Sequence, residues 1–89
     1  MEVIKNKFYY VYFLKSLKDG SYYIGTSDNP PRRLKEHNLG MSKSTRFKRP
    51  WKIVRIERFD NIKAAYQRER YLKAKKSRKI IEKIIKSDK

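Results

Sequence analysis

Residues 8–26 of this 89-residue chain are FYYVYFLKSLKDGSYYIGT, and they decide the fold. The aromatic and β-branched run from Phe8 to Leu14 predicts a strand that is covered on both faces or lies at the centre of a sheet. Lys18-Asp19-Gly20-Ser21 follows, and Asp-Gly between two such runs is a strong hairpin signal. Tyr22 to Thr26 is then the antiparallel partner strand.

The next segment predicts a helix, a loop and a third strand. The helix signals are a cap at Asp28 or Asn29, first-turn prolines at Pro30 and Pro31, helical residues Arg32 to Asn38 and a terminating Gly40. Residues 41–50 are polar and basic, which is typical of a loop. Residues 51–59 alternate in polarity and predict a strand. Its faces would carry Trp51, Ile53, Arg55, Glu57 and Phe59 on one side and Lys52, Val54, Ile56 and Arg58 on the other.

Two amphipathic helices complete the chain, and Asn61 and Ser77 can cap them. Their core-facing stripes would be Ile62, Ala65, Tyr66 and Leu72 in the first and Ile80, Ile81, Ile84 and Ile85 in the second. The order β-β-α-β-α-α predicts an α+β fold, with a small three-stranded antiparallel or mixed sheet flanked by helices. We expect a single domain over residues 1–89, with its core at about 8–86.

Positive charge dominates the composition. Lys and Arg number 25 against 9 Asp and Glu, which gives a net charge of +16. Such an excess costs folding stability through self-repulsion and is relieved by a polyanion, for which nucleic acid is the leading candidate. A protein scaffold associated with ribosomes, or a protein from an organism whose proteins are generally rich in Lys, would have the same excess of positive charge.

The residue types that are missing exclude several kinds of site. The chain has no Cys and one His, which excludes disulfides, Cys-zinc sites, iron–sulfur clusters, thiol nucleophiles and multi-His metal sites. It has no apolar run of the ~18 residues that a membrane span needs, and no secretory signal. We therefore expect a soluble, cytoplasmic protein with no membrane partner.

Four residues in two pairs are candidates for chemistry. Antiparallel pairing brings Tyr12 and Tyr23 alongside each other, either as ordinary strand tyrosines or as two phenols in one site. Arg33 and His37 are four residues apart on one helix face. A guanidinium can hold a phosphate with two hydrogen bonds, and an imidazole titrates near neutrality. The alternative is a solvated basic face.

Glu69 shares the helical phase of Ala65 and Leu72 and is therefore expected to face the core. A buried carboxylate must be paired or must hold a cation. Arg68, Arg70 and Lys73 are close enough in sequence to pair with it. The alternative ligand is Mg²⁺, which takes one or two carboxylates and keeps its waters.

These residues resemble the GIY-YIG endonucleases. The resemblance rests on Tyr10-Val11-Tyr12, on Tyr23-Ile24-Gly25 ten residues later, on Arg32 to Asn38 and on Ala65 to Lys73. It covers roughly residues 8 to 86 and is nearest to the short, single-domain, UPF0213-like branch of the superfamily. Tyr10 stands where the family signature has Gly.

The resemblance implies phosphodiester hydrolysis with a single Mg²⁺ or Mn²⁺ ion. Tyr12 would be the general base and Tyr23 would orient it by a hydrogen bond, or the two roles would be exchanged. Arg33 would stabilise the pentacoordinate transition state, with help from His37 as a phosphate contact or proton relay. Glu69 would hold the metal. Nearby cations should lower the pKa of the Tyr12 phenol, and all five residues should converge on one concave face of the sheet.

Basic residues of the loop and helices would follow the nucleic-acid backbone with little sequence selection. These contacts would be Lys43, Arg46, Lys48, Arg49, Arg68, Lys73 and Lys76. We expect DNA in preference to RNA, and a monomer or weak homodimer. The competing hypotheses are a non-catalytic nucleic-acid- or ribosome-binding module on the same scaffold and, less favoured, a membrane-surface protein using its last helix.

Overall fold

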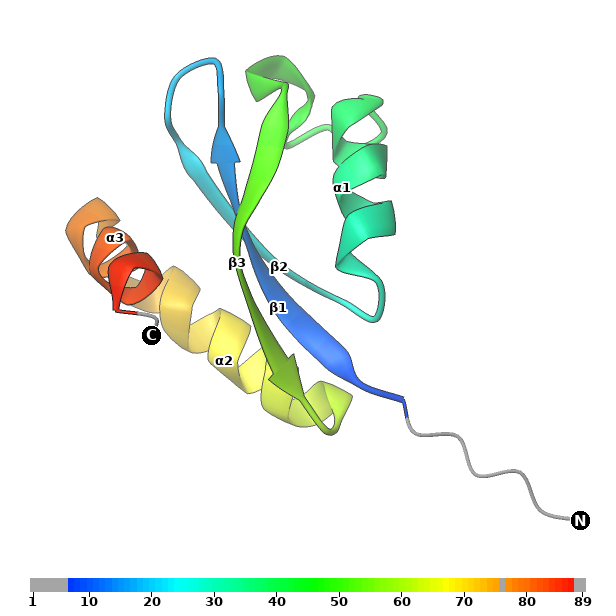
Figure 1. The fold of residues 1–89 in the computed structure, drawn as a ribbon, viewed down its shortest axis with the longest axis vertical. Coiled ribbons are helices and arrows are strands. Elements are labelled where there is room, and N and C mark those ends of the chain that lie inside the picture. Colours follow the sequence, from blue (N-terminus) through cyan, green and yellow to red (C-terminus); the bar gives the residue numbers. More distant parts are fainter. Residues whose placement is uncertain (1–6, 76, 88–89) are drawn as a thin grey trace, which may run out of the picture.

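The computed structural model describes residues 7–75 and 77–87. Its elements are β1 (Tyr9–Ser16), β2 (Tyr22–Ser27), α1 (Pro30–Asn38), the 3-10 helix η1 (Arg46–Lys48), β3 (Trp51–Phe59), α2 (Ile62–Lys75) and α3 (Arg78–Lys86). They form the predicted α+β fold in the predicted order, with η1 added in the loop before β3 (Figure 1). Among the described residues, no helix is long and apolar enough to cross a membrane.

The strands form one antiparallel sheet in the order β2-β1-β3, so β1 is central as predicted. Tyr12 of β1 lies opposite Gly25 of β2 and Ile56 of β3. The β1–β2 turn closes through a hydrogen bond from the Gly20 N–H to the Ser16 carbonyl (2.9 Å). Gly20 has a φ of +78°, which is the left-handed conformation that favours glycine at such a turn. Both β2 and β3 are edges of this sheet.

The predicted division of β3 into two faces is wrong beyond Ile53. A register shift between Phe13 and Leu14 leaves Phe13 opposite Arg55 and Leu14 opposite Ile53. One additional residue on β3 reverses the side-chain alternation, as a β-bulge does. Trp51 and Ile53 therefore pack on one face of the sheet, while Val54 and Phe59 pack on the other.

Helices cover both faces of the sheet (Figure 1). The face under α1 contains a cluster of Tyr12, Leu14 and Trp51, with Tyr23, Leu34 and Ile53 packed against it. The face under α2 and α3 contains Val11, Phe13, Ile24, Ala65, Leu72 and Ile81. Adjacent residues of β1 thus supply two separate cores, which explains why its sequence is apolar without alternation.

The predicted helix ends are confirmed in detail. Asn29 caps α1 by accepting a hydrogen bond from the Arg32 N–H, and Pro30 and Pro31 occupy the first turn, as predicted. Gly40, with φ +82°, follows the C-cap residue Leu39. The Gly40 and Met41 N–H groups donate to the carbonyls of His37 and Glu36, which is a Schellman motif.

Asn61 and Ser77 accept hydrogen bonds from the first turns of α2 and α3, as predicted. The predicted stripes are only partly correct. Ile62 and Tyr66 are 40% and 50% exposed, because the face of α2 that meets the sheet runs through Ala65 and Leu72. Ile80 is likewise exposed on α3, whereas Ile81 is buried.

Candidate active site

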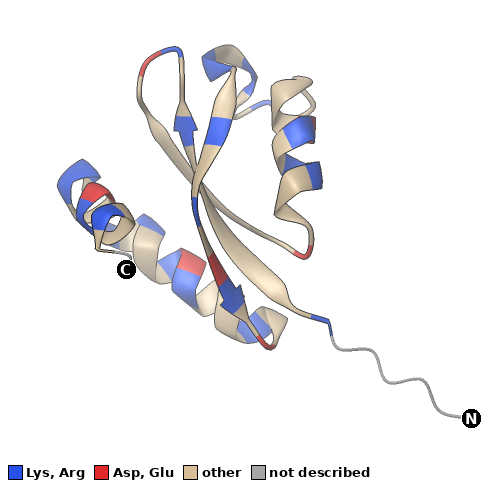
Figure 2. Ribbon diagram, in the orientation of Figure 1, with Lys and Arg blue, Asp and Glu red and all other residues tan. Residues whose placement is uncertain are grey.

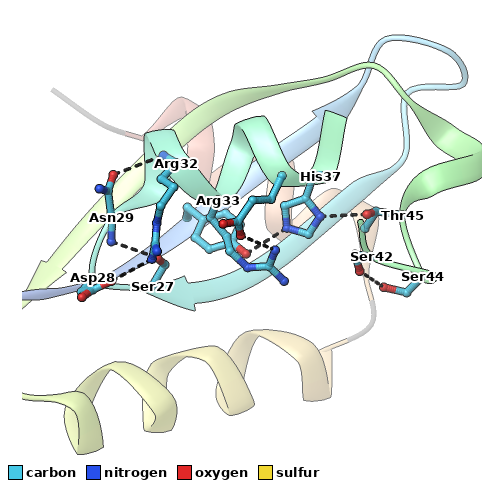
Figure 3. Close-up of polar contacts among 11 residues, drawn as sticks. Ser27, Asp28, Asn29, Arg32, Arg33, His37, Ser42, Ser44 and Thr45 are labelled. Atoms are coloured by element: carbon cyan, nitrogen blue, oxygen red, sulfur yellow. Dashed lines mark hydrogen bonds and ion pairs between the residues drawn. The ribbon is translucent and has the colours of Figure 1, made fainter. Parts of the chain in front are cut away.

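A buried chain of hydrogen bonds lies between α1 and the sheet. The Tyr12 hydroxyl is 3.1 Å from His37 Nε2. On the other side of the ring, His37 Nδ1 is 2.8 Å from Thr45 Oγ1, as Figure 3 shows. Tyr12 is 1% exposed, and His37 and Thr45 are completely buried. Both imidazole nitrogens are thus occupied, so the expectation that His37 could contact a phosphate directly is wrong. Its position beside Tyr12 is compatible with the alternative role, a proton relay.

Thr45 is a site residue that sequence reasoning missed. It lies in the loop after α1, where its side chain has no periodicity to mark it as buried. The Trp51 indole N–H donates to the Thr45 carbonyl (2.9 Å). The Asn38 side chain in turn donates to the Trp51 carbonyl (3.0 Å) and accepts from the Trp51 N–H (2.7 Å). These bonds join the end of α1, the loop and the start of β3, and so hold Thr45 against His37.

Tyr23 packs beside this chain without joining it. Its ring centroid lies 6.4 Å from that of Tyr12, 5.0 Å from that of His37 and 6.3 Å from that of Trp51. The Tyr12 hydroxyl is bonded to His37 rather than to Tyr23, so the predicted orienting hydrogen bond is wrong. Tyr23 is half-buried, and of the two phenols it is the one that faces solvent.

Gly25 is required by the position of the Tyr12 ring. A Cβ atom at residue 25 would lie 2.5 Å from Tyr12 Oη and 2.6 Å from Tyr12 Cζ. Because Gly25 is the cross-strand partner of Tyr12, the ring folds over its backbone and reaches His37. The glycine of Tyr23-Ile24-Gly25 therefore provides space for the tyrosine of the first motif.

Arg33 lies on α1, one turn before His37. Its guanidinium donates to the Glu36 carboxylate (3.1 Å), and both side chains are about one-third exposed. Arg33 also lines a polar cleft of about 370 Å³ at the end of β2. The polar cleft includes Lys7, Thr26, Ser27, Arg32, Arg33 and Tyr66.

Glu69 reaches the site from the opposite side of the sheet. Its carboxylate accepts a short hydrogen bond from the Thr26 hydroxyl of β2 and forms an ion pair with Lys73 (2.7 Å). Its side chain is 19% exposed, so it faces inward in part, as predicted. The expectation of one concave face is wrong, because α2 and α1 cover opposite faces. Glu69 instead approaches the free edge of β2 through Thr26, close enough to Tyr12 for its charge to raise the Tyr12 pKa.

A family model described as the GIY-YIG catalytic domain matches residues 8–83. The chain belongs to the GIY-YIG family. Its departure from the family signature, Tyr10, is half-buried in β1 opposite Ser27 and Arg58.

Several relatives share this GIY-YIG domain. A UPF0213 protein of Clostridium perfringens is 46% identical over 65 residues, covering 72% of this chain and 69% of that protein. The structure-specific endonuclease subunit slx1 of Schizosaccharomyces pombe is 44% identical over 52 residues, covering 52% of this chain and 19% of that protein. The solution NMR structure of a UPF0213 protein of Bacillus halodurans has a TM-score of 0.58 and 33% identity, covering 91% of this chain and 85% of that one.

Burial controls the protonation of Tyr12 and His37, the central pair of the candidate site. Burial raises the pKa of Tyr12 above its ordinary value, and Tyr23 and Glu69 add to the rise while Arg33 opposes it. Nearby cations were expected to lower the pKa of Tyr12, but the effect of burial is larger than that of Arg33. Burial also lowers the pKa of His37 below its ordinary 6.5, and Arg33 lowers it further. Both groups are neutral at pH 7.

The donor set around Glu69 fits a hydrated divalent cation. Among the residues that the structure describes, no group of three His, Asp or Glu side chains could enclose an ion. Mg²⁺ commonly binds one or two carboxylates, keeps waters and shares its shell with a phosphate. The Glu69 carboxylate and the adjacent Thr26 hydroxyl suit that mode, provided that Lys73 moves off the carboxylate.

The predicted nucleic-acid contacts differ in their availability. Lys43, Lys48 and Arg49 are exposed in the loop before β3, and Arg46 is half-buried there. Figure 2 shows Lys and Arg in this loop and along all three helices. Lys76 lies outside the described residues.

Arg68 is engaged with another residue and is a poor candidate for a phosphate contact. Its guanidinium donates two hydrogen bonds to the Glu57 carboxylate (2.8 and 3.0 Å), and Arg55 donates a third (2.9 Å). Although burial acts to raise the pKa of Glu57, these two arginines lower it. This cluster of Glu57 with the two arginines attaches α2 to β3.

Proposed function

We propose that this protein is a metal-dependent endonuclease that hydrolyses phosphodiester bonds in nucleic acid, selecting structure more than sequence. The observation that carries the proposal is the buried series of hydrogen bonds from Tyr12 through His37 to Thr45, in a protein of the GIY-YIG family. Relatives named as structure-specific endonuclease subunits share part of this domain. We further propose that it acts in the cytoplasm, on DNA in preference to RNA, as a monomer or weak homodimer.

The central pair suits a proton relay better than a preformed phenolate. The tautomer with hydrogen on Nδ1 donates to Thr45 Oγ1, which leaves Nε2 to accept from Tyr12. Tyr12 can then accept a proton from the attacking water as it passes its own to His37. Because the raised pKa of Tyr12 disfavours a free phenolate, this coupled transfer avoids that species and leaves the proton on His37 as an imidazolium, whose cost is reflected in the lowered pKa of His37.

Arg33 and Glu69 divide the remaining duties. Arg33 stays charged and can hold two phosphate oxygens, so it suits the additional negative charge of the transition state. Glu69, with Thr26 beside it, would hold Mg²⁺ or Mn²⁺. When bound, the ion would act as a Lewis acid at the leaving oxygen.

The test is cleavage of labelled branched, single-stranded and duplex DNA and RNA with Mg²⁺ or Mn²⁺. Arg33→Ala should lower the cleavage rate by roughly 10²–10³-fold, the cost of losing a preorganised charge donor. The matched control is Lys35→Ala, which removes one exposed positive charge from the same helix and should leave the rate nearly unchanged.

A non-catalytic nucleic-acid-binding module is the alternative function, and the net charge of +16 favours it equally. The same experiment separates the two. If the wild-type protein cuts no substrate with either metal, and if wild type, Arg33→Ala and Lys35→Ala bind nucleic acid alike, the protein is a binding module and not a nuclease.

A further inference from the structure

A second cleft borders the active site, on the opposite side from the polar cleft. This apolar cleft, of about 390 Å³, lies between edge strand β2 and the corner where α2 meets α3. Its walls include Tyr22, Tyr23, Leu72, Lys73, Arg78 and Ile81. Its size falls within the roughly 300–1,000 Å³ of ordinary ligand pockets. Its walls are aromatic and aliphatic, with cations at the rim.

The apolar cleft shares residues with the active site. Tyr23 lines the cleft and also lies edge-on to His37, 5.0 Å between ring centroids. Lys73 lines the cleft and also forms the ion pair with Glu69. A ligand in the cleft would therefore lie directly beside the groups proposed to act on the phosphodiester.

The chemistry of the walls identifies the kind of ligand. Arg78 Cζ lies 5.2 Å from the Tyr22 ring centroid, and Lys73 Nζ lies 5.6 Å from that of Tyr23. Arg78 also pairs with Glu82 and Lys73 with Glu69, but both cations are at least half exposed, and such surface pairs are weak enough for an anionic ligand to compete with them. Aromatic rings with adjacent cations favour a flat, apolar group joined to an anion. A nucleobase with its phosphate has that composition, and stacking on aromatic side chains is how proteins hold single-stranded nucleic acid.

We propose that the apolar cleft binds one unpaired nucleobase of the strand that is cut, an inference that rests on the proposed nuclease function. A base within a duplex is paired and stacked on both sides, so it cannot enter the cleft without leaving the helix. The polar cleft, with Lys7, Arg32 and Arg33, then receives the backbone at the other end of β2. The strand would run along the free edge of β2, past Glu69, and the substrate would carry an unpaired nucleotide next to the cleaved bond.

The test compares two duplexes of one length, one fully paired and one with a single bulged 2-aminopurine, a fluorescent base. Affinity and fluorescence are measured in EDTA, so that binding is separated from cleavage. The variants are Tyr22→Leu, which removes a stacking ring, and Arg78→Gln, which changes an exposed residue and leaves the core intact. The matched control is Tyr71→Leu, at a half-exposed tyrosine of α2 outside both clefts.

We expect wild type to prefer the bulged duplex and to quench its fluorescence by stacking. Tyr22→Leu should weaken binding of the bulged duplex by roughly 5- to 150-fold, the usual range for one stacked base, and leave the paired duplex unchanged. Arg78→Gln should act in the same direction more weakly, and Tyr71→Leu should have no effect. Equal affinities for the two duplexes in wild type, or variants that weaken both equally, would overturn the proposal.

Cleavage measured on the same pair of duplexes separates this inference from the proposed function. Preference for the bulge without any cleavage would support the base site and refute the nuclease. Cleavage of both duplexes at equal rates, without preferential binding, would support the nuclease and refute the base site.

Discussion

The ring of Tyr12 lies over the backbone of Gly25, its cross-strand neighbour, and reaches His37 on the far side of that space. The two residues belong to the two halves of the family signature. A side chain at residue 25 and the tyrosine at residue 12 compete for one volume. This competition makes the contact testable by mutation.

Gly25→Ala should destabilise the fold and disable the site. The new Cβ would lie 2.5 Å from Tyr12 Oη, so the ring must move off His37. Overpacking of this kind typically costs about 1–3 kcal/mol of unfolding free energy, measurable by urea denaturation. In the double variant Gly25→Ala with Tyr12→Leu, the smaller side chain should accommodate the methyl group. Its destabilisation should be less than the sum of the two single effects, and simple additivity would contradict the contact.

Removing the relay should affect cleavage and spare binding. Tyr12→Phe and His37→Gln should each lower the cleavage rate by roughly 10²–10⁴-fold, the usual contribution of a positioned acid–base group. Affinity for uncut substrate in EDTA should stay close to wild type, because both side chains are buried. Cleavage at the wild-type rate by Tyr12→Phe would eliminate Tyr12 as the proton acceptor.

Thr45 should act as a positioning residue through His37. Thr45→Val keeps the shape but leaves His37 Nδ1 without its partner, so cleavage should fall. Thr45→Ser keeps the hydroxyl and should preserve most of the rate. The pH–rate profile distinguishes this role from simple destabilisation, because loss of the bond to Nδ1 should shift the profile. An unshifted profile in Thr45→Val would mean that Thr45 only fills space.

Acid should destabilise the protein through His37. The pKa of His37 is lowered in the folded state, below its ordinary 6.5. Above 6.5 the imidazole is neutral in both states, and its contribution to stability is complete. As pH falls below 6.5, the unfolded chain takes up a proton that the folded chain excludes, so the unfolding free energy decreases until the folded pKa is passed. Melting curves between pH 8 and 5 should show a shallower decline in His37→Gln, and identical slopes would refute this assignment.

Glu69 and Lys73 should have opposite effects on metal binding. Glu69→Gln removes the proposed ligand and should abolish Mn²⁺ binding, measured by electron paramagnetic resonance of the free ion. Lys73→Met removes the cation that pairs with this carboxylate at 2.7 Å. Partly exposed pairs of this kind are worth up to about 1 kcal/mol, so Mn²⁺ affinity should rise by up to about 5-fold. Unchanged Mn²⁺ binding in Glu69→Gln would place the metal elsewhere.

Nucleic-acid binding should depend steeply on salt and little on sequence. If about six phosphates of a duplex are neutralised, log K should fall with log salt at a slope between about −5 and −6. Removing one exposed loop cation, as in Lys43→Ala, should make the slope shallower by about one. Arg68→Ala should leave it nearly unchanged, because Glu57 already neutralises Arg68. A wild-type slope near −1 would mean that the charge serves another purpose.

Local sequence was sufficient for the elements and their ends. The run from Phe8 to Leu14, the Asp19-Gly20 turn and the caps at Asn29, Asn61 and Ser77 act through residues that are neighbours in the chain. Backbone preference and short-range hydrogen bonds therefore specify them without knowledge of the rest of the fold. The pairing of Tyr12 with the Tyr23-Ile24-Gly25 strand follows from the same turn.

Only the tertiary structure decided which site residues are buried and from which side of the sheet each one approaches. Helical spacing places His37 on the same face as Arg33, but only the covering by the 41–50 loop makes one buried and the other accessible. The β-bulge that divides β3 between two cores depends on its pairing with β1, and Glu69 approaches over the β2 edge because of how α2 packs. Each of these outcomes depends on contacts between distant segments, and periodicity within a single element contains no information about which segment covers it.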